Sequence, residues 1–226
     1  MGVELTIIEK IAVWTLPVLF AITVHEVAHG YVAKLLGDQT ASRLGRLTLN
    51  PIKHIDLVGT LVVPGLLLAL GGFVFGWAKP VPVVMDNLRR PQRDMALVAI
   101  AGPLSNLIMA LMWAAVSKIG VIVGSEASAL ALACFYIGSA GVVINLILLV
   151  LNLIPIPPLD GSRVVNAFLP GPIAYRYNQV EPYGFFILLG LLILGVLSYV
   201  LWPPVIYIGQ FISQLFGIPS VFFLLV

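Results

Sequence analysis

The chain has 226 residues, of which 60% are hydrophobic and only 10% are charged, and its mean hydropathy is +1.08. A typical soluble domain has about 25% charged residues, so the composition excludes a soluble protein and indicates an integral membrane protein. The net charge of +2 gives no reason to expect a nucleic acid partner. The single cysteine, Cys134, excludes an internal disulfide and a cysteine-rich metal site.

Long uncharged segments predict the membrane helices in chain order. We expect a first, retained span over about residues 9–35, then an apolar segment over 57–77 that lies between two basic loops. Further helices are expected over about 95–118 and 128–153, and a proline-rich stretch follows them as far as Asp160.

The last uncharged segment, about 182–225, predicts a helical hairpin. Its break is expected at Pro203-Pro204, because consecutive prolines remove helix donors and clash with the preceding turn. The expected fold is an all-α polytopic membrane protein with about five spanning helices. Residues 1–226 would form a single domain, with a catalytic core over about 9–165.

His25-Glu26-Val27-Ala28-His29 is an H-E-x-x-H motif within an apolar run, residues 11–33, in which Glu26 is the only formally charged residue. On a helix, two imidazoles four residues apart share one face, which suits two ligands of one tetrahedral zinc ion. Glu26 lies beside them as a candidate general base. Because an isolated carboxylate in hydrocarbon is costly, this placement predicts a functional site.

A zinc site of this kind needs a third protein ligand, with the fourth position left for water. Asp160 is the strongest candidate. Three prolines before it end the preceding helix and can turn the chain back toward the membrane, and Gly161 permits a tight return. His54, the only other histidine, is the rival third ligand.

Residues 57–77 are predicted to enter the membrane and return on the same side. In that case ten of the 12 basic residues lie on one side, and only Lys10 and Lys118 lie on the other. A crossing segment would give five against seven, contrary to the positive-inside tendency. A metal shared by His29 and Asp160 also requires an even number of crossings between them. The helices over 95–118 and 128–153 supply two.

For the two basic loops, the sequence is equally consistent with short surface strands and with plain extended loop. Leucines alternate with polar or small residues in 41–49, and the prolines in 79–85 permit only an edge strand.

Three segments in this order resemble the motifs of the site-2 protease family, the intramembrane zinc metalloproteases of peptidase family M50. They are the H-E-x-x-H motif, Ala101-Gly-Pro-Leu-Ser-Asn106, and Asn152-Leu-Ile-Pro-Ile-Pro-Pro-Leu-Asp160-Gly161. Asn50-Pro-Ile-Lys-His-Ile-Asp56 and Phe75-Gly-Trp-Ala-Lys-Pro-Val-Pro-Val83 further resemble the small bacterial branch without a PDZ domain. The resemblance covers about residues 10–165.

The resemblance implies that His25, His29 and Asp160 bind one zinc ion per chain, and that Glu26 activates the attacking water. It implies that Asn152 positions the substrate or stabilises the oxyanion. The implied substrate is a transmembrane helix of another protein, and the implied location is a bacterial cytoplasmic membrane. The active site would face the cytoplasm, in agreement with the ten basic residues on one side.

Four residues are candidates for other roles at the site. A substrate helix must unwind before it is cleaved, and Val81 and Val83 are candidates for a strand edge that would hold the unwound segment. His54 is either a gating residue near the site or an ordinary loop histidine. Asn106 either supports helix packing or lies close to the active site.

A metal-ion transporter or channel is the alternative function, since intramembrane ionisable residues also mark ion pathways. Glu26 between the two histidines favours the protease, and so does the absence of the internal repeats that many transporters have. The sequence leaves the oligomeric state and the identity of the substrate open.

Overall fold

The structure is a computed structural model that describes residues 5–62, 78–124 and 128–221. Within these ranges the ordered elements are all helices, and four of them are long and apolar enough to cross a membrane. They are α1 (Ile7–Leu35), α4 (Pro91–Val123), α5 (Ala129–Leu153) and α9 (Val196–Phe216). The predicted all-α polytopic membrane fold is confirmed.

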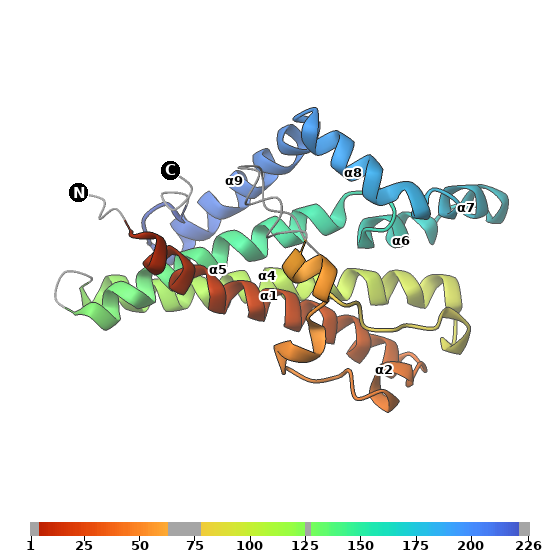
Figure 1. The fold of residues 1–226 in the computed structure, drawn as a ribbon, viewed down its shortest axis with the longest axis horizontal. Helices are drawn as coiled ribbons and strands as arrows, with labels where there is room; N and C mark the ends of the chain where they lie inside the picture. Colours follow the sequence, from red (N-terminus) through yellow and green to blue (C-terminus); the bar gives the residue numbers. More distant parts are fainter. Residues whose placement is uncertain (1–4, 63–77, 125–127, 222–226) are drawn as a thin grey trace.

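Short helices connect the long ones. They are α2 (Thr40–Arg43), η1 (Pro51–His54), η2 (Leu57–Val62), η3 (Met85–Asn87), α6 (Asp160–Asn166), α7 (Gly171–Asn178), η4 (Glu181–Tyr183) and α8 (Gly184–Ile193). Figure 1 shows α2, α6 and α7 at one end of the bundle, where α1 ends and α4 begins. Both basic loops and the segment that carries Asp160 therefore lie toward the same end.

Helices α1, α4 and α5 pack together and form the part of the fold that positions the site. The contact between α4 and α5 is close because glycines let the two backbones approach. A Cβ atom at Gly138 would lie 2.4 Å from the Ser117 nitrogen, and one at Gly120 would lie 2.5 Å from the Ala131 oxygen. These helices consequently present buried polar side chains to one another across a short distance.

Helix α1 begins at a capping box, in which the Thr6 hydroxyl accepts a hydrogen bond from the Glu9 amide and the Glu9 carboxylate accepts one from the Thr6 amide. Its buried face carries the H-E-x-x-H histidines. Elsewhere on the helix, large apolar side chains such as Ile8, Ile11 and Phe20 are exposed, as expected for a helix in contact with lipid.

The C-terminal hairpin differs from the sequence prediction. Pro203 and Pro204 lie inside α9, and the chain turns instead at Gly195, whose φ of 73° is left-handed. A glycine adopts this conformation without steric cost and ends helix α8. At 10 residues, α8 is about 15 Å long. It is too short to cross a hydrocarbon core of about 30 Å, so the described residues contain four spans rather than about five.

The predicted surface strands are also absent from the described residues. Within 41–49, the first residues belong to α2, and no strand follows them. Residues 79–84 form neither helix nor strand. The Val81 and Val84 amides bond to carboxylate side chains instead of a neighbouring strand, so the extended-loop alternative is correct.

The residues that flank the predicted re-entrant segment, His54 and Lys79, lie next to each other. The Lys79 amide donates a hydrogen bond of 2.9 Å to the His54 carbonyl oxygen. A segment that crossed the membrane would separate its ends by about 30 Å, so this contact agrees with a return on the same side. Residues 63–77 themselves lie outside the described part of the chain.

Candidate metal centre

The three predicted metal ligands meet at one point. His25 Nε2 and His29 Nε2 are 3.0 Å apart, and the Asp160 Oδ2 atom lies 3.2 Å from the first and 3.3 Å from the second. Both histidines come from the buried face of α1, and Asp160 is the first residue of α6. Residues 131 positions apart in the sequence, His29 and Asp160, thus form one cluster.

The cluster fits a tetrahedral zinc ion. Ligand atoms at about 2.0–2.1 Å from such an ion lie about 3.3 Å from one another, and the three observed separations are 3.0, 3.2 and 3.3 Å. The Asp160 Oδ2 atom is buried and has no hydrogen-bond partner. Since two imidazole nitrogens and a carboxylate oxygen are ordinary zinc ligands, the donor set also fits chemically.

Each histidine is oriented by a hydrogen bond at its other ring nitrogen. His25 Nδ1 lies 2.6 Å from Asn106 Oδ1, and His29 Nδ1 lies 2.7 Å from the Val98 carbonyl oxygen. Carbonyl and amide oxygens only accept hydrogen bonds, so both Nδ1 atoms carry the proton. The Nε2 lone pairs are therefore free to bind a metal, as in many metal sites.

A glycine of α4 makes room for both imidazoles. A Cβ atom at Gly102 would lie 2.4 Å from His29 Nε2 and 2.6 Å from His25 Cε1. The α4 backbone at Gly102 thus packs directly against both imidazole rings. Gly102 lies inside α4, which begins at Pro91, so its role is this close approach to the two imidazoles.

Comparison with known proteins decides the family. The chain is 42% identical over 190 residues to YwhC of Bacillus subtilis (strain 168), and the match covers 82% of each chain. It is 31% identical over 181 residues to Rip2 of Mycolicibacterium smegmatis (strain ATCC 700084 / mc(2)155), covering 80% of this chain and 66% of that protein. Both names describe putative zinc metalloproteases. The model of peptidase family M50 matches residues 116–195, which include Asn152 and Asp160.

The chain belongs to peptidase family M50. No solved structure is significantly similar to it. Membership, together with the donor cluster, makes the chain an integral-membrane metalloprotease with zinc as its cofactor. The resemblance inferred from the sequence motifs is thereby confirmed.

In this M50 peptidase, Glu26 contacts the extended segment 79–84 and lines the same small cavity as the metal ligands. Its Oε2 atom accepts a hydrogen bond of 2.6 Å from the Val81 amide. The Oε1 atom has no hydrogen bond within the described residues, so this oxygen can accept a proton. Val81 and Val83 both line a small polar cavity of about 170 Å³ together with the metal ligands.

Two further anchors hold the same segment. The Arg46 guanidinium donates hydrogen bonds to the carbonyl oxygens of Lys79 and Pro80, at 2.8 and 3.3 Å. The Asp38 carboxylate accepts one of 2.7 Å from the Val84 amide. Burial opposes ionisation of Asp38, but its hydrogen bonds from Thr40, Val84 and Asn87 outweigh this effect and hold the pKa of the carboxyl below its ordinary value.

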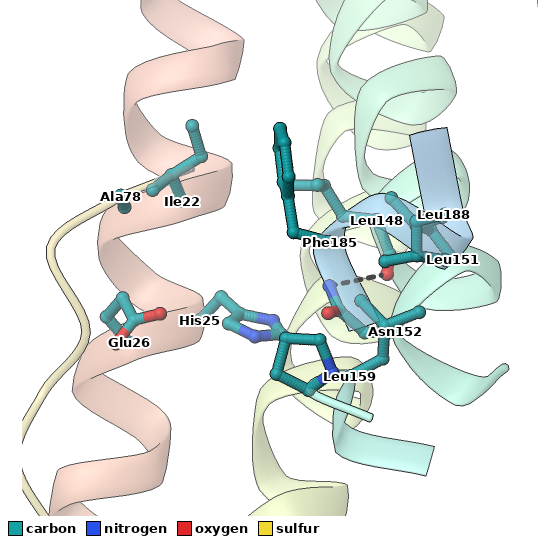
Figure 2. Close-up of a pocket in the computed structure, with 11 residues that line it drawn as sticks. Ile22, His25, Glu26, Ala78, Leu148, Leu151, Asn152, Leu159, Phe185 and Leu188 are labelled. Carbon is teal, nitrogen blue, oxygen red and sulfur yellow. Dashed lines mark hydrogen bonds between the residues drawn. The ribbon is translucent and has the colours of Figure 1, made fainter. Parts of the chain in front are cut away.

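A larger and mostly apolar cavity of about 440 Å³ adjoins the metal centre. Figure 2 shows its walls, with His25 and Glu26 of α1 on one side and Asn152 of α5 on the other. Asn152 donates a hydrogen bond of 3.0 Å to the Leu148 carbonyl oxygen, which orients its amide at the cavity wall. Apolar side chains complete the lining, among them Ile22, Leu148, Leu151, Phe185 and Leu188.

Some residues and backbone atoms that contribute to the site could not be identified from the M50 motifs. Phe185 and Leu188 belong to α8, in a region without any recognisable motif, and they reach the cavity because Gly184 packs on the Pro157 carbonyl oxygen. The Val98 carbonyl oxygen is a backbone atom and leaves no signal in the sequence. Asn106 was predicted either to support helix packing or to lie close to the active site, and its amide oxygen lies against His25.

His54 is buried, with 2% of its surface exposed. Its Nε2 atom lies 2.9 Å from the Thr48 carbonyl oxygen, within the same loop. It is not part of the cluster of metal-binding groups found among the described residues. His54 is therefore a buried loop residue here, and its candidacy as the third ligand is not supported.

Proposed function

We propose that this protein is an intramembrane zinc endopeptidase that hydrolyses peptide bonds within the transmembrane segments of other membrane proteins. The observation that carries the proposal is the position of the donor cluster. His25, His29 and Asp160 converge on a long apolar helix, beside a cavity with apolar walls. A soluble peptide would have little reason to enter such a cavity, whereas an apolar membrane segment would lose little on transfer from lipid.

The residues of the site divide the reaction between them. When bound by His25, His29 and Asp160, zinc would polarise the scissile carbonyl group and acidify the attacking water. Glu26 takes the proton from that water as the new C–O bond forms. It then delivers the proton to the nitrogen of the leaving amine as the C–N bond breaks. The Asn152 amide, on the opposite wall, is placed to hydrogen-bond the substrate backbone or the developing oxyanion.

The extended segment 79–84 would hold the unwound substrate by its backbone. Along an extended chain, the N–H and C=O groups of alternate residues point the same way. Val81 directs its amide toward Glu26, so the polar groups of Val83 face the same side. Within the described residues, the Val83 amide and carbonyl group have no hydrogen bond. They are therefore available to pair with an added strand.

We place the catalytic end toward the cytoplasm of a bacterial inner membrane. The basic loops and the α6–α7 region lie at the end of the bundle where α1 ends (Figure 1). Lys10 lies near the start of α1 and Lys118 lies near the end of α4, so both lie toward the other end of the bundle. This distribution supports a cytoplasmic location for the larger basic group. Regulated cleavage of a membrane-bound partner is the corresponding cellular role.

The decisive experiment replaces the base while leaving the ligands intact. Wild type, Glu26→Gln and Glu9→Gln are compared in liposomes for bound zinc and for cleavage of a panel of transmembrane peptides. Glu9 lies on the same helix, in its N-terminal capping box. We expect Glu26→Gln to retain zinc and to lose at least about 100-fold in cleavage rate, since general base catalysis typically contributes 10²–10⁴-fold. Glu9→Gln should cleave at nearly the wild-type rate.

Three outcomes would contradict the proposal. Unchanged cleavage by Glu26→Gln would remove Glu26 as the base. Cleavage of soluble peptides but of no membrane peptide would remove the intramembrane substrate. Zinc flux across the liposomes without any cleavage would favour the transporter alternative.

A further inference from the structure

A chain of buried amides connects the metal centre to the interior of the bundle. Asn106 Oδ1 lies 2.6 Å from His25 Nδ1, and Asn106 Nδ2 donates to Asn145 Oδ1 at 2.9 Å. Asn145 Nδ2 in turn donates to the Gly141 carbonyl oxygen at 2.8 Å. Both asparagines have no exposed surface. This series of hydrogen bonds runs from α5 through α4 to α1.

Backbone carbonyl groups fix the direction of this chain. The Gly141 oxygen can only accept, so Asn145 must turn its NH₂ group toward it and its oxygen toward Asn106. The Asn106 NH₂ group then faces Asn145, and also the Ala21 carbonyl oxygen at 3.3 Å. The remaining Asn106 oxygen faces His25, which must present its Nδ1–H.

We propose that Asn145 is a positioning residue for the metal centre: by orienting the Asn106 amide, it fixes the Nδ1-protonated tautomer of His25 and leaves Nε2 free for the metal. The inference rests on the metal-binding part of the proposed function. Without Asn145, the Asn106 NH₂ group retains only the longer contact to Ala21. The amide can then rotate and present NH₂ to His25, which stabilises the tautomer whose Nε2 carries the proton and cannot bind zinc.

A second polar pair in the same interface provides the contrast. Ser117 and Ser139 also join α4 to α5, with their hydroxyl oxygens 3.1 Å apart, and both are fully buried. The Ser117 hydroxyl group donates to the Phe135 carbonyl oxygen at 3.3 Å. The serine pair has no contact with a metal ligand. It therefore provides a matched control for loss of a buried polar contact between these helices.

The test measures zinc affinity by chelator competition in four purified proteins: wild type, Asn145→Leu, Asn145→Asp and Ser139→Ala. Asn145→Leu should weaken zinc binding about 10-fold to 100-fold, the usual effect of losing an outer partner of a ligand. A neutral aspartic acid keeps one donor and one acceptor, and burial in a low-dielectric site favours that neutral form. Asn145→Asp should therefore bind zinc within a few-fold of wild type, as should Ser139→Ala.

A second measurement does not depend on the folding of any variant. The ¹⁵N spectrum of histidine in metal-free wild type, recorded at alkaline pH, should show His25 protonated at Nδ1. Nε2 protonation would overturn the inference, and so would wild-type zinc affinity in folded Asn145→Leu. An equal loss of affinity in Ser139→Ala would assign the effect to packing and also overturn it. A wild type that binds no zinc would contradict the proposed function as well, whereas normal zinc binding in Asn145→Leu contradicts this inference alone.

Discussion

Two segments reach the metal centre from outside the three-helix core, and they are held in different ways. Residues 154–161 bring Asp160 to the histidines, and residues 79–84 run past Glu26. The first segment is fixed by close backbone packing. The second is fixed mainly by hydrogen bonds to three side chains.

Backbone packing dominates around Asp160. A Cβ atom at Gly161 would lie 2.2 Å from the Leu153 carbonyl oxygen, and one at Gly184 would lie 1.8 Å from the Pro157 carbonyl oxygen. The proline-rich turn is therefore enclosed between the end of α5 and the start of α8. Moving Asp160 requires the displacement of backbone atoms, which is costly in a packed interior.

Hydrogen bonds, most of them to side chains, hold residues 79–84 beside the site. Glu26, Asp38 and Arg46 bond to the backbone of Val81, Val84 and Lys79–Pro80 respectively. Rotation of a side chain can break any one of these bonds without moving a helix. The difference indicates that the wall of the site that carries Asp160 is fixed. The wall that we propose binds the substrate can adjust to the substrate.

Gly161→Ala should have the largest effect, because it disturbs the fixed wall. The added methyl group would collide with the Leu153 carbonyl oxygen, so α6 and Asp160 must shift. We expect zinc occupancy to fall and kcat/KM to drop more than about 100-fold, beyond the 10-fold to 100-fold effect of an outer-shell change. Gly190→Ala is the matched control, because nothing lies within 4 Å of a Cβ atom there. The measurements are the zinc content and the rate of peptide cleavage. Wild-type zinc content and wild-type kinetics in Gly161→Ala would show that this packing does not position Asp160.

Val83→Pro should have an intermediate effect confined to the adjustable wall. Proline removes the amide that we propose to pair with the substrate, and it leaves the metal ligands and the bond between Val81 and Glu26 unchanged. We expect zinc binding to stay normal and kcat/KM to fall about 5-fold to 13-fold, the equivalent of one lost hydrogen bond of about 1–1.5 kcal/mol.

Val83→Ala supplies the control, since it keeps the amide and shortens only the side chain. If both variants lose the same activity, the side chain rather than the backbone contacts the substrate. If Val83→Pro cleaves normally, this segment does not bind the substrate as a strand.

The long helices and the ligand set could be predicted from the sequence. The length of an apolar segment is a local property, and ionisable side chains in such a segment are costly enough to indicate a function. Apolar length predicted α1, α4 and α5 to within a few residues. The H-E-x-x-H spacing placed two imidazoles on one face of α1. The need to bring Asp160 to them also predicted a return of residues 57–77, and the hydrogen bond between His54 and Lys79 agrees with that prediction.

Packing across helices could not be predicted in the same way. Gly161 was expected to allow an unusual turn, but it is not among the glycines with positive φ, and its role is the close approach to Leu153. Pro203-Pro204 was expected to break a helix, yet the break lies at Gly195. In membranes, neighbouring groups can satisfy the backbone that a proline frees. Asn145 carried no signal because its partner lies 39 positions away.

Asp38→Asn should have the smallest effect, and its pH dependence gives the sharpest test of the side-chain anchors. The carboxylate accepts from the Val84 amide at 2.7 Å and from Asn87 at 3.0 Å. Loss of its charge should lower the free energy of unfolding by about 1.5–3 kcal/mol at pH 7, as for hydrogen bonds to charged groups. Activity should fall less than in Val83→Pro. Asp86→Asn, an exposed neighbour, is the control.

The sign of the pH effect follows from the lowered pKa of Asp38. Its stabilisation is fully present above the unfolded-state pKa of about 3.9 and is lost as the pH falls through the lower folded-state pKa. Thermal denaturation in detergent should therefore show the full difference between wild type and Asp38→Asn near neutral pH. The difference should shrink below about pH 4. A difference that is constant down to pH 2 would mean that the carboxylate charge does not hold the segment, because only the ionised form can accept from every donor around it.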